Sequence, residues 1–315
     1  MKPLYLPLLA LVVLTGCGRE KSAPSGENAG TRVVALADAR KGFQTQLARR
    51  ESANEPVPEP PAAVFRTVRY DAPVGKLAAY LTPDPRDGKR HPAIIWITGG
   101  DCNSIGDVWT AQPASNDQTA SAFRQAGVVL MFPSLRGGND NPGVREGFFG
   151  EVDDVLAAAD FLARQEYVDP ARIYLGGHST GGTLALLVAE YTDRFRAVFS
   201  FGPVDDVRGY GPEYAPFAAA DPREAELRAP GRWLASIKTP TFVIEGTADG
   251  NLDCLRNMAR VSTNPRVQFL AVRGANHFSV LAPTTKRIAA RLLRDDGPAC
   301  NLAFTEDELS RAFGR

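Results

Sequence analysis

The sequence predicts an α/β fold built on a mainly parallel, doubly wound sheet that begins with an antiparallel hairpin. Three observations support this fold class. Continuous apolar runs at 93–97, 128–132 and 241–244 are typical of strands buried on both faces of a parallel sheet. Segments with helical periodicity separate these runs, so strand and helix alternate. A further apolar strand at 173–175 leads through a glycine-rich turn directly into a helix.

The predicted elements follow one another along the chain without an internal repeat. An alternating segment at 64–70 and its partner at 76–81, joined across Pro73-Val74-Gly75, form the hairpin. Strands are predicted at 93–97, 128–132, 173–175, 197–201, 241–244 and 267–272. Helices are predicted at 118–125, 150–165, after Ser179, and at 252–261 and 284–294. Ligands of such folds bind at the carboxyl ends of the strands, where we expect the functional site.

The folded part is expected to be one α/β domain at 62–315, a length that single domains of this class reach. Within it, the segment 202–237 interrupts the alternation with several prolines and aromatic residues. Because this segment follows the carboxyl end of a strand, it could form a lid or a wall of the binding pocket. A surface insertion packed only for stability is the alternative.

The N-terminus has the charged start and short apolar core of a secretory signal at 1–16. The run ends in Leu14-Thr15-Gly16-Cys17, which resembles the lipobox of bacterial lipoproteins and implies a lipid on Cys17. Gly18 would follow the lipidated residue, which favours the outer membrane, with the protein facing the periplasm. Residues 17–61 then read as a flexible tether. An ordinary secreted protein with an incidental Cys17 remains the alternative.

The charge balance and the cysteines exclude several classes of function. Lysine plus arginine and aspartate plus glutamate each total 36, so a basic nucleic-acid-binding surface is not expected. Besides Cys17, an oxidising compartment would allow one disulfide among Cys102, Cys254 and Cys300, and the sequence does not choose the pair. No CxxC or His/Cys cluster predicts a metal, and no cofactor is expected.

A Gly-x-Ser-x-Gly motif, Gly177-His178-Ser179-Thr180-Gly181, lies between the strand at 173–175 and the next helix. This context predicts a nucleophile elbow, in which a strained Ser179 presents its hydroxyl above the sheet. Gly177 and Gly181 would let the two backbones approach, because neither carries a Cβ. A glycine-rich turn without chemistry is the alternative.

A serine nucleophile needs a base and an acid that orients it. Of three histidines, His178 adjoins the serine and His91 precedes a strand at the far end of the sheet, so His277, after the strand at 267–272, is the predicted base. Asp249, in the loop after the strand at 241–244, is the predicted acid. The competitors for the acid are Glu245, which reads as part of the strand, and Asp253, which reads as a helix N-terminal charge.

The oxyanion of the acyl intermediate needs backbone N–H donors. One is expected from Thr180, the residue after the nucleophile. The other is expected from Gly100 or Asp101 in the loop after the strand at 93–97, whose glycines allow the peptide to turn inward. A simple strand-ending turn is the alternative for this loop.

These motifs together resemble an α/β-hydrolase of the prolyl-oligopeptidase-like group over residues 64–295. The resemblance is carried by the stretches 133–138, 151–155, 168–173, 177–181 and 246–249, and by His277-Phe278. It implies a triad of Ser179, Asp249 and His277. Thr98 stands before Gly99-Gly100 where the group often has histidine. Arg136 is expected to form a structural ion pair with Asp153 or Asp154.

We therefore expect a serine hydrolase that forms an acyl-enzyme, with small esters as the first substrate class and short peptides as the second. Esters come first because full oligopeptidases of the group carry a large N-terminal propeller, whereas about 45 residues of tether precede the first strand here. A noncatalytic lipoprotein that binds an envelope partner is an alternative of another class. A lipase would need an apolar lid, which the charged, proline-rich 202–237 does not favour.

Overall fold

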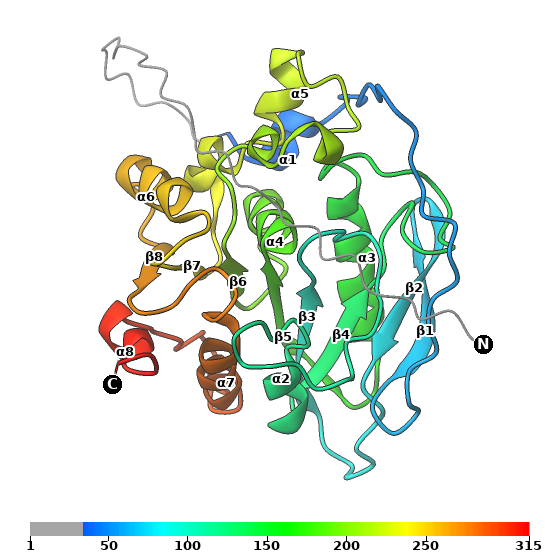
Figure 1. Cartoon of the computed structure of the whole chain (residues 1–315). Helices are drawn as coiled ribbons and strands as arrows, with labels where there is room; N and C mark the ends of the chain where they lie inside the picture. Colours follow the sequence, from blue (N-terminus) through cyan, green and yellow to red (C-terminus); the bar gives the residue numbers. More distant parts are fainter. Residues whose placement is uncertain (1–33, 315) are drawn as a thin grey trace, which may run out of the picture.

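A computed structural model describes residues 34–314. Its centre is an eight-stranded sheet in the order β1-β2-β4-β3-β5-β6-β7-β8 (Figure 1). The strands are β1 (Arg66–Ala72), β2 (Gly75–Leu81), β3 (His91–Ile97), β4 (Val129–Pro133), β5 (Val168–His178), β6 (Val198–Phe201), β7 (Thr241–Gly246) and β8 (Val267–Val272). β1 and β2 pair antiparallel, β2 joins β4 antiparallel, and the pairs from β4 to β8 are parallel. The predicted fold class, an α/β-hydrolase fold with an N-terminal hairpin, is confirmed.

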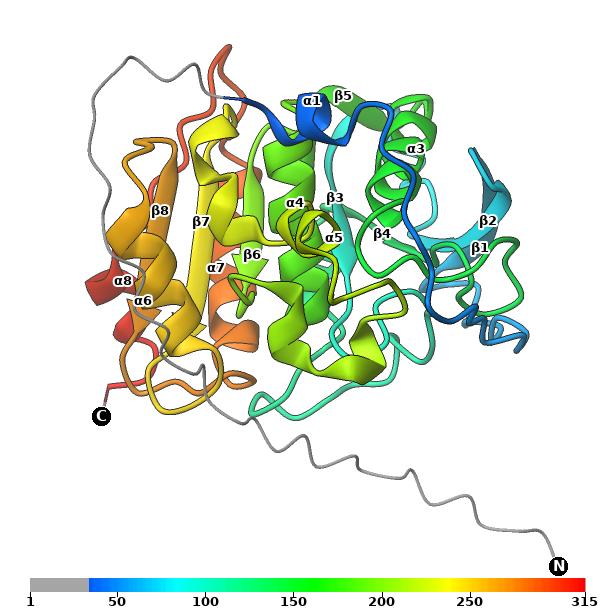
Figure 2. The same cartoon turned by 90° about the horizontal axis from the view of Figure 1, so that it is seen from above.

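Helices cover both faces of the sheet (Figure 2). α1, α3, α4 and α6 pack on one face, while α2, α7 and α8 lie on the other. Their bounds are α1 (Leu36–Arg40), α2 (Ser121–Gln125), α3 (Glu151–Ala163), α4 (Thr180–Tyr191), α5 (Pro222–Glu226), α6 (Leu252–Val261), α7 (Leu281–Leu292) and α8 (Glu306–Ser310). Within residues 34–314, no helix is long and apolar enough to cross a bilayer.

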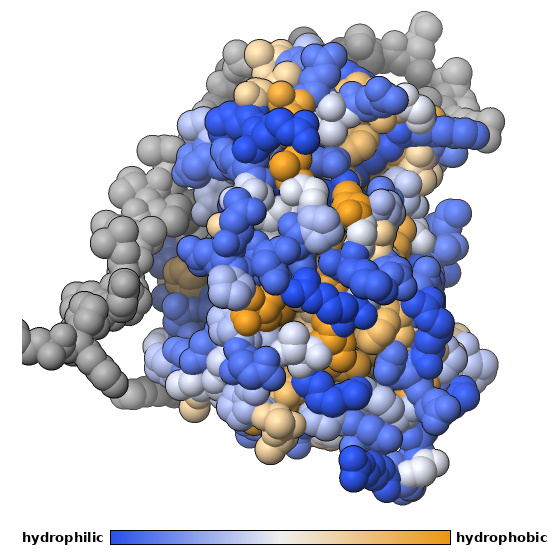
Figure 3. Space-filling view, turned by 90° about the vertical axis from the view of Figure 1, so that its right-hand side faces the viewer, coloured by the Kyte–Doolittle hydropathy of each residue, from blue (hydrophilic) through white to orange (hydrophobic). Residues whose placement is uncertain are grey.

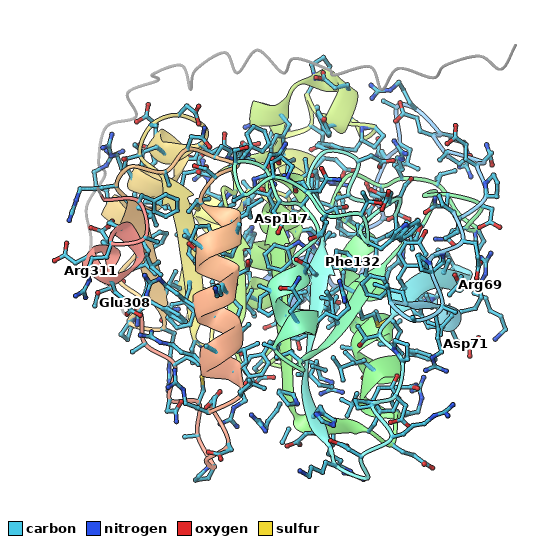
Figure 4. The ribbon with its side chains drawn as sticks, turned by 60° about the horizontal axis from the view of Figure 1, so that its bottom comes forward. Arg69, Asp71, Asp117, Phe132, Glu308 and Arg311 are labelled. Atoms are coloured by element: carbon cyan, nitrogen blue, oxygen red, sulfur yellow. The ribbon has the colours of Figure 1, made fainter. Side chains whose placement is uncertain are left out.

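Each face of the sheet has its own hydrophobic core, because successive strand residues point to opposite faces. Ile95 and Leu175 belong to the core under α3 and α4, whereas Ile94 and Tyr174 belong to the core under α2 and α7. Figure 4 shows Phe132 of β4 inside the molecule, with labelled residues of β1 and α8 at its two opposite sides. The apolar runs of the sequence are continuous for this reason: both faces of these strands are buried.

The predicted elements are found with shifted ends. The helix at 252–261 and the strand at 267–272 have the predicted bounds. The helix predicted at 118–125 begins later, at Ser121, and ends at Gln125 as predicted. β5 is longer than predicted, because it continues to His178 at the elbow. β7 continues to Gly246 and therefore includes Glu245.

Residues 34–61, here called the N-terminal arm, follow the surface of the domain rather than standing away from it as a tether. The arm pairs with the segment 202–237 through the Leu47–Phe217 bridge and the hydrogen bond from Ala218 N to Gln46 O, 2.9 Å. It also pairs with the β4–α3 loop, where Arg145 N donates to Glu51 O at 2.9 Å. The predicted signal and Cys17 lie outside the described residues.

Two buried arginines join the arm, the β4–α3 loop and the segment 202–237. Arg40 of α1 donates to the carbonyl oxygens of Phe148, Phe149 and Leu227. Arg228 donates to Glu146 O, Gly147 O and Thr45 Oγ1, and it forms an ion pair with Glu224 in which both side chains are fully buried. The three segments therefore form one packed unit above α3 and α4.

The surface at the β1 edge of the sheet is mostly hydrophilic, with apolar residues in small separate groups (Figure 3). Ion pairs such as Arg69–Asp140 and Lys76–Asp71 lie on or beside the β1–β2 hairpin. The predicted structural pair is also present: Arg136 makes two side-chain hydrogen bonds to the buried Asp154. No disulfide bond joins the cysteines within residues 34–314.

Candidate active site

Ser179 lies at the sharp turn between β5 and α4. Its φ of 55° and ψ of −117° fall in a region that non-glycine residues rarely adopt, as expected of a nucleophile elbow. A Cβ on Gly177 would lie 2.3 Å from Gly181 O, and one on Gly181 would lie 2.3 Å from Ile97 O. Both glycines are therefore required by the close approach of the backbones that holds Ser179 in this conformation.

The predicted base, His277, follows β8 and is 5% exposed. Its Nδ1 lies 2.8 Å from Oε2 of Glu245, whose side chain is completely buried. Two backbone N–H groups also donate to this carboxylate: Gly246 N to Oε1 at 2.7 Å and Asn251 N to Oε2 at 3.0 Å. An ionised Glu245 accepts the Nδ1 proton and leaves Nε2 as the nitrogen free to accept another.

The carboxylate on the ring differs from the one that the sequence predicted. Asp249 was expected to orient the imidazole, but its side chain accepts the backbone N–H of His277 at 3.0 Å, and Asp249 is exposed. Glu245 belongs to the strand, as the sequence suggested, yet it reaches the ring from there. A glutamate side chain is one methylene longer than aspartate, and β7 ends directly beside the loop that carries His277. Asp253, the other competitor, pairs loosely with Arg256 on the surface.

Two glycines make room for the His277–Glu245 pair. A Cβ on Gly202 would lie 2.5 Å from His277 Cε1 and 2.8 Å from Glu245 Oε2. A Cβ on Gly250 would lie 2.9 Å from His277 Nδ1 and 3.0 Å from Glu245 Oε2. Both glycines also have positive φ, 58° and 88°. Any side chain at either position would displace the imidazole or the carboxylate.

Contacts around β6 bring the imidazole next to the elbow. Ser179 N donates to Phe201 O at 2.7 Å, and Gly202, the next residue, lies against the His277 ring. Asn251 Nδ2 donates to Gly202 O at 2.7 Å and ties the loop after β7 to the same point. The carboxyl ends of β5, β6, β7 and β8 thus gather the serine, the histidine and the glutamate at one edge of the sheet.

His178, next to Ser179, packs against the imidazole of His277. Its ring centroid lies 4.5 Å from that of His277, and its Nε2 lies 3.0 Å from His277 O, a carbonyl that can only accept. Nε2 therefore carries the proton. Burial, followed by the neighbouring His277, holds the pKa of His178 well below its ordinary value. His178 thus stays neutral and does not place a second positive charge beside His277. His91, predicted to precede the strand, is the first residue of β3 and pairs with Asp87.

The loop after β3 lies against the nucleophile. A Cβ on Gly99 would be 3.2 Å from Ser179 Cβ, and Thr180 Oγ1 donates to Gly100 O at 2.9 Å. Gly100 has a φ of 73°, a conformation that glycine adopts readily. Thr180 begins α4, and the first N–H groups of a helix have no partner within the helix. Of the three residues predicted as oxyanion donors, Thr180 follows the nucleophile and is hydrogen-bonded to Gly100, and Asp101 comes next to Gly100 in the loop.

A cavity of about 250 Å³ opens beside this loop. Gly100 and Asp101 line this cavity, and so does Arg145, which forms an ion pair with Asp101 at 2.7 Å. The N-terminal arm contributes Glu51, and the segment 202–237 contributes Glu213, Tyr214 and Pro216. The segment is thus a wall of this cavity. The contribution of the arm could not be found from its composition, which is polar and proline-rich.

Cys102 and Tyr210 are two further titratable side chains in this region. Burial raises the pKa of the Cys102 thiol, which lines the cavity, so the thiol stays protonated near neutral pH. Burial likewise raises the pKa of the Tyr210 hydroxyl. Within the described part of the chain, no group of three or more His, Cys, Asp or Glu side chains is placed to hold a metal ion.

The family model described as "Prolyl oligopeptidase family" matches residues 114–295, more than half of the chain. Among curated proteins, the chain is 31% identical over 106 residues to the "Dual function macrocyclase-peptidase POPB" of Amanita bisporigera. That stretch covers 31% of this chain and 14% of the relative, so the chain matches about a seventh of the relative's length.

Solved structures show the same fold at low sequence identity. A puromycin-hydrolyzing peptidase of Mycobacterium tuberculosis is 21% identical, with a TM-score of 0.57 over 72% of this chain and 38% of its own. An esterase of Pyrobaculum calidifontis is also 21% identical, with a TM-score of 0.53 over 77% of this chain and 87% of its own. These two likenesses concern the fold.

Proposed function

The chain belongs to the prolyl oligopeptidase family, whose members are serine hydrolases, and we propose that it cleaves carboxylic esters with Ser179, His277 and Glu245 as its triad. The observation that carries the proposal is the buried His277–Glu245 pair set beside a serine in the strained elbow conformation. The pair fixes the imidazole with Nε2 unprotonated, which is the form that a general base needs.

In the proposed reaction, Ser179 Oγ attacks the acyl carbon while its proton passes to His277 Nε2. Glu245 holds the ring and stabilises the imidazolium without taking the proton. The imidazolium then protonates the leaving alkoxide, and an acyl-enzyme remains. Water attacks this ester with His277 again as base, and the proton returns to Ser179 Oγ as the acid product leaves.

We assign the oxyanion site to the backbone N–H of Thr180 and to that of Gly100 or Asp101. Support comes from the contact of Gly99 with Ser179 and from the hydrogen bond that joins Thr180 to Gly100. Backbone donors fixed in this way need no reorganisation when negative charge develops on the carbonyl oxygen.

Esters with small acyl groups are the first substrate class that we propose, because the cavity beside the oxyanion loop holds about 250 Å³. Short peptides are the second candidate. They are favoured by the curated relatives, such as the macrocyclase-peptidase that is 31% identical over 106 residues. The two classes use the same triad and differ in the leaving group that His277 must protonate.

A fluorophosphonate probe and two chromogenic substrate series test this function. The folded protein should be labelled by the probe and should hydrolyse p-nitrophenyl acetate or butyrate, and Ser179→Ala should abolish labelling and lower kcat by about 10⁵-fold or more. Faster turnover of aminoacyl arylamides than of the esters would replace the ester assignment by the peptide one. A folded wild-type protein that neither labels nor turns over would refute both.

We further propose that the protein is anchored in the bacterial outer membrane, facing the periplasm, by a lipid on Cys17. The sequence of residues 1–18 supports this proposal. Metabolic labelling with a fatty acid in a bacterial host should modify the wild-type protein and not Cys17→Ser, and equal labelling of the two would contradict it.

A further inference from the structure

Resting on the function proposed above, we infer that Tyr210 is a further catalytic residue, whose hydroxyl donates a hydrogen bond to Ser179 Oγ. Tyr210 ends the short 3-10 helix η1 (Val207–Tyr210) in the segment 202–237. Its ring is held on two sides, stacked on Phe148 with centroids 6.1 Å apart and tilted against Tyr214 at 5.5 Å. The hydroxyl is therefore presented from a fixed ring.

The phenol lies beside the start of α4, near the hydroxyl of Thr183 and that of Ser179, which precedes the helix. Tyr210 Oη lies 2.7 Å from Thr183 Oγ1, and the Ser179 hydroxyl is near enough to the phenol to influence its ionisation. Thr183 N donates to Ser179 O at 2.8 Å, so Thr183 closes the first turn of α4 directly after the nucleophile. Thr183 is completely buried, and its hydroxyl has no access to solvent.

The direction of the hydrogen bonds follows from counting protons. Val204 N, which can only donate, lies 3.0 Å from Thr183 Oγ1 and occupies one of its lone pairs. Thr183 can then give its own proton to Tyr210 Oη, and Tyr210 can give its proton to Ser179 Oγ. The proton of Ser179 remains available for His277. In this arrangement each hydroxyl donates once, and the chain starts at a fixed backbone N–H.

The phenol stays protonated throughout, because burial raises its pKa. It therefore acts as a donor and not as a base. When the acyl-enzyme breaks down, the bond between the acyl carbon and Oγ breaks, its electron pair stays on Oγ, and His277 supplies the proton. Partial negative charge on Oγ at that moment is stabilised by the Tyr210 hydrogen bond, which transfers no proton.

Tyr210→Phe tests the role, since it removes the hydroxyl and keeps the ring on Phe148. We expect kcat for p-nitrophenyl butyrate to fall about 10- to 100-fold, with KM changed less than about threefold, as for loss of one donor to a developing charge. Rapid-mixing experiments should show a larger burst of p-nitrophenol, because deacylation slows. Tyr191→Phe, at the other end of α4, is the matched control and should keep wild-type kcat.

Thr183 is a positioning residue in this scheme, and a pair of variants tests it independently of Tyr210. Thr183→Val should lower kcat, whereas Thr183→Ser, which keeps the hydroxyl, should restore it to within about threefold of wild type. If neither Thr183 variant folds, the Tyr210→Phe variant alone decides the inference, because its ring keeps the packing against Phe148.

The outcomes separate the inference from the function on which it rests. If wild type turns over and Ser179→Ala does not, the proposed function holds. Under those conditions, a Tyr210→Phe enzyme with wild-type kcat, or with a loss confined to KM, would overturn the inference alone. A wild-type protein without turnover would overturn both.

Discussion

At the scale of single residues, the serine and the histidine of the candidate site are those that the sequence predicted, whereas the carboxylate on the imidazole is another residue. Ser179 is embedded in a local motif, and His277 was found by elimination among three histidines. The acid depends on side-chain reach across the end of β7, which no local pattern encodes. The Glu245 carboxylate lies beside the His277 ring, and Gly250 makes room for it because it has no Cβ.

Substitution of the two carboxylates distinguishes their roles. Glu245→Gln should lower kcat by about 10⁴-fold, because a neutral amide neither fixes the correct tautomer nor stabilises the imidazolium. Asp249→Asn is the matched variant, since an amide oxygen can still accept the backbone N–H of His277, and it should cost less than about tenfold. Steady-state kinetics on one ester measure both. The reverse order of effects would return the acid role to Asp249.

At the scale of elements, the central strands were predictable and the short helices were not. Strands buried on both faces leave continuous apolar runs, and α6 leaves a strong helical period. α1 and α5 have five residues each, too few for a periodic signal, and tertiary contacts determine them. The packing of 202–237 depends on Arg40 and Arg228, whose charge alone suggests a surface position.

Loss of one of these buried charges should weaken the whole unit that they join. Arg228→Met leaves the Glu224 carboxylate buried without its partner, and we expect the free energy of unfolding to fall by about 3–5 kcal/mol. Arg208→Met removes the exposed pair with Asp206 in the same segment and should cost less than about 1 kcal/mol. Urea denaturation compares the two. Equal stabilities would show that Arg228 contributes no more than a surface charge.

At the scale of the whole molecule, stability should depend on the pH through Glu190, at the end of α4. Both carboxylate oxygens are buried without a hydrogen-bond partner, and burial, only partly offset by Arg40, raises the pKa of this group well above its ordinary value. The folded state therefore binds the proton more tightly than the unfolded state. Stability is greatest below the unfolded pKa, near 4.5, and is lost as the pH rises above it.

Glu190→Gln should remove this loss. Relative to wild type, the variant should gain up to about 1.4 kcal/mol of stability per pH unit above the ordinary glutamate pKa, until the folded group ionises. Denaturation curves between pH 5 and pH 8 would show the gap widening, whereas the exposed Glu166→Gln should run parallel to wild type. A difference in stability between wild type and Glu190→Gln that stays constant with pH would mean that the Glu190 carboxyl group of the wild type is ionised in the folded protein.

The arm has a practical consequence for anyone who shortens the chain. A recombinant fragment that starts at the first strand, as the composition of residues 17–61 would suggest, lacks Thr45, Glu51 and the guanidinium of Arg40. Such a product would leave Phe149 and Phe217 uncovered and would have an open side where the native enzyme has a wall. The solubility and substrate range measured for such a fragment would reflect the missing arm and not the native protein. A recombinant protein should therefore begin before Leu36.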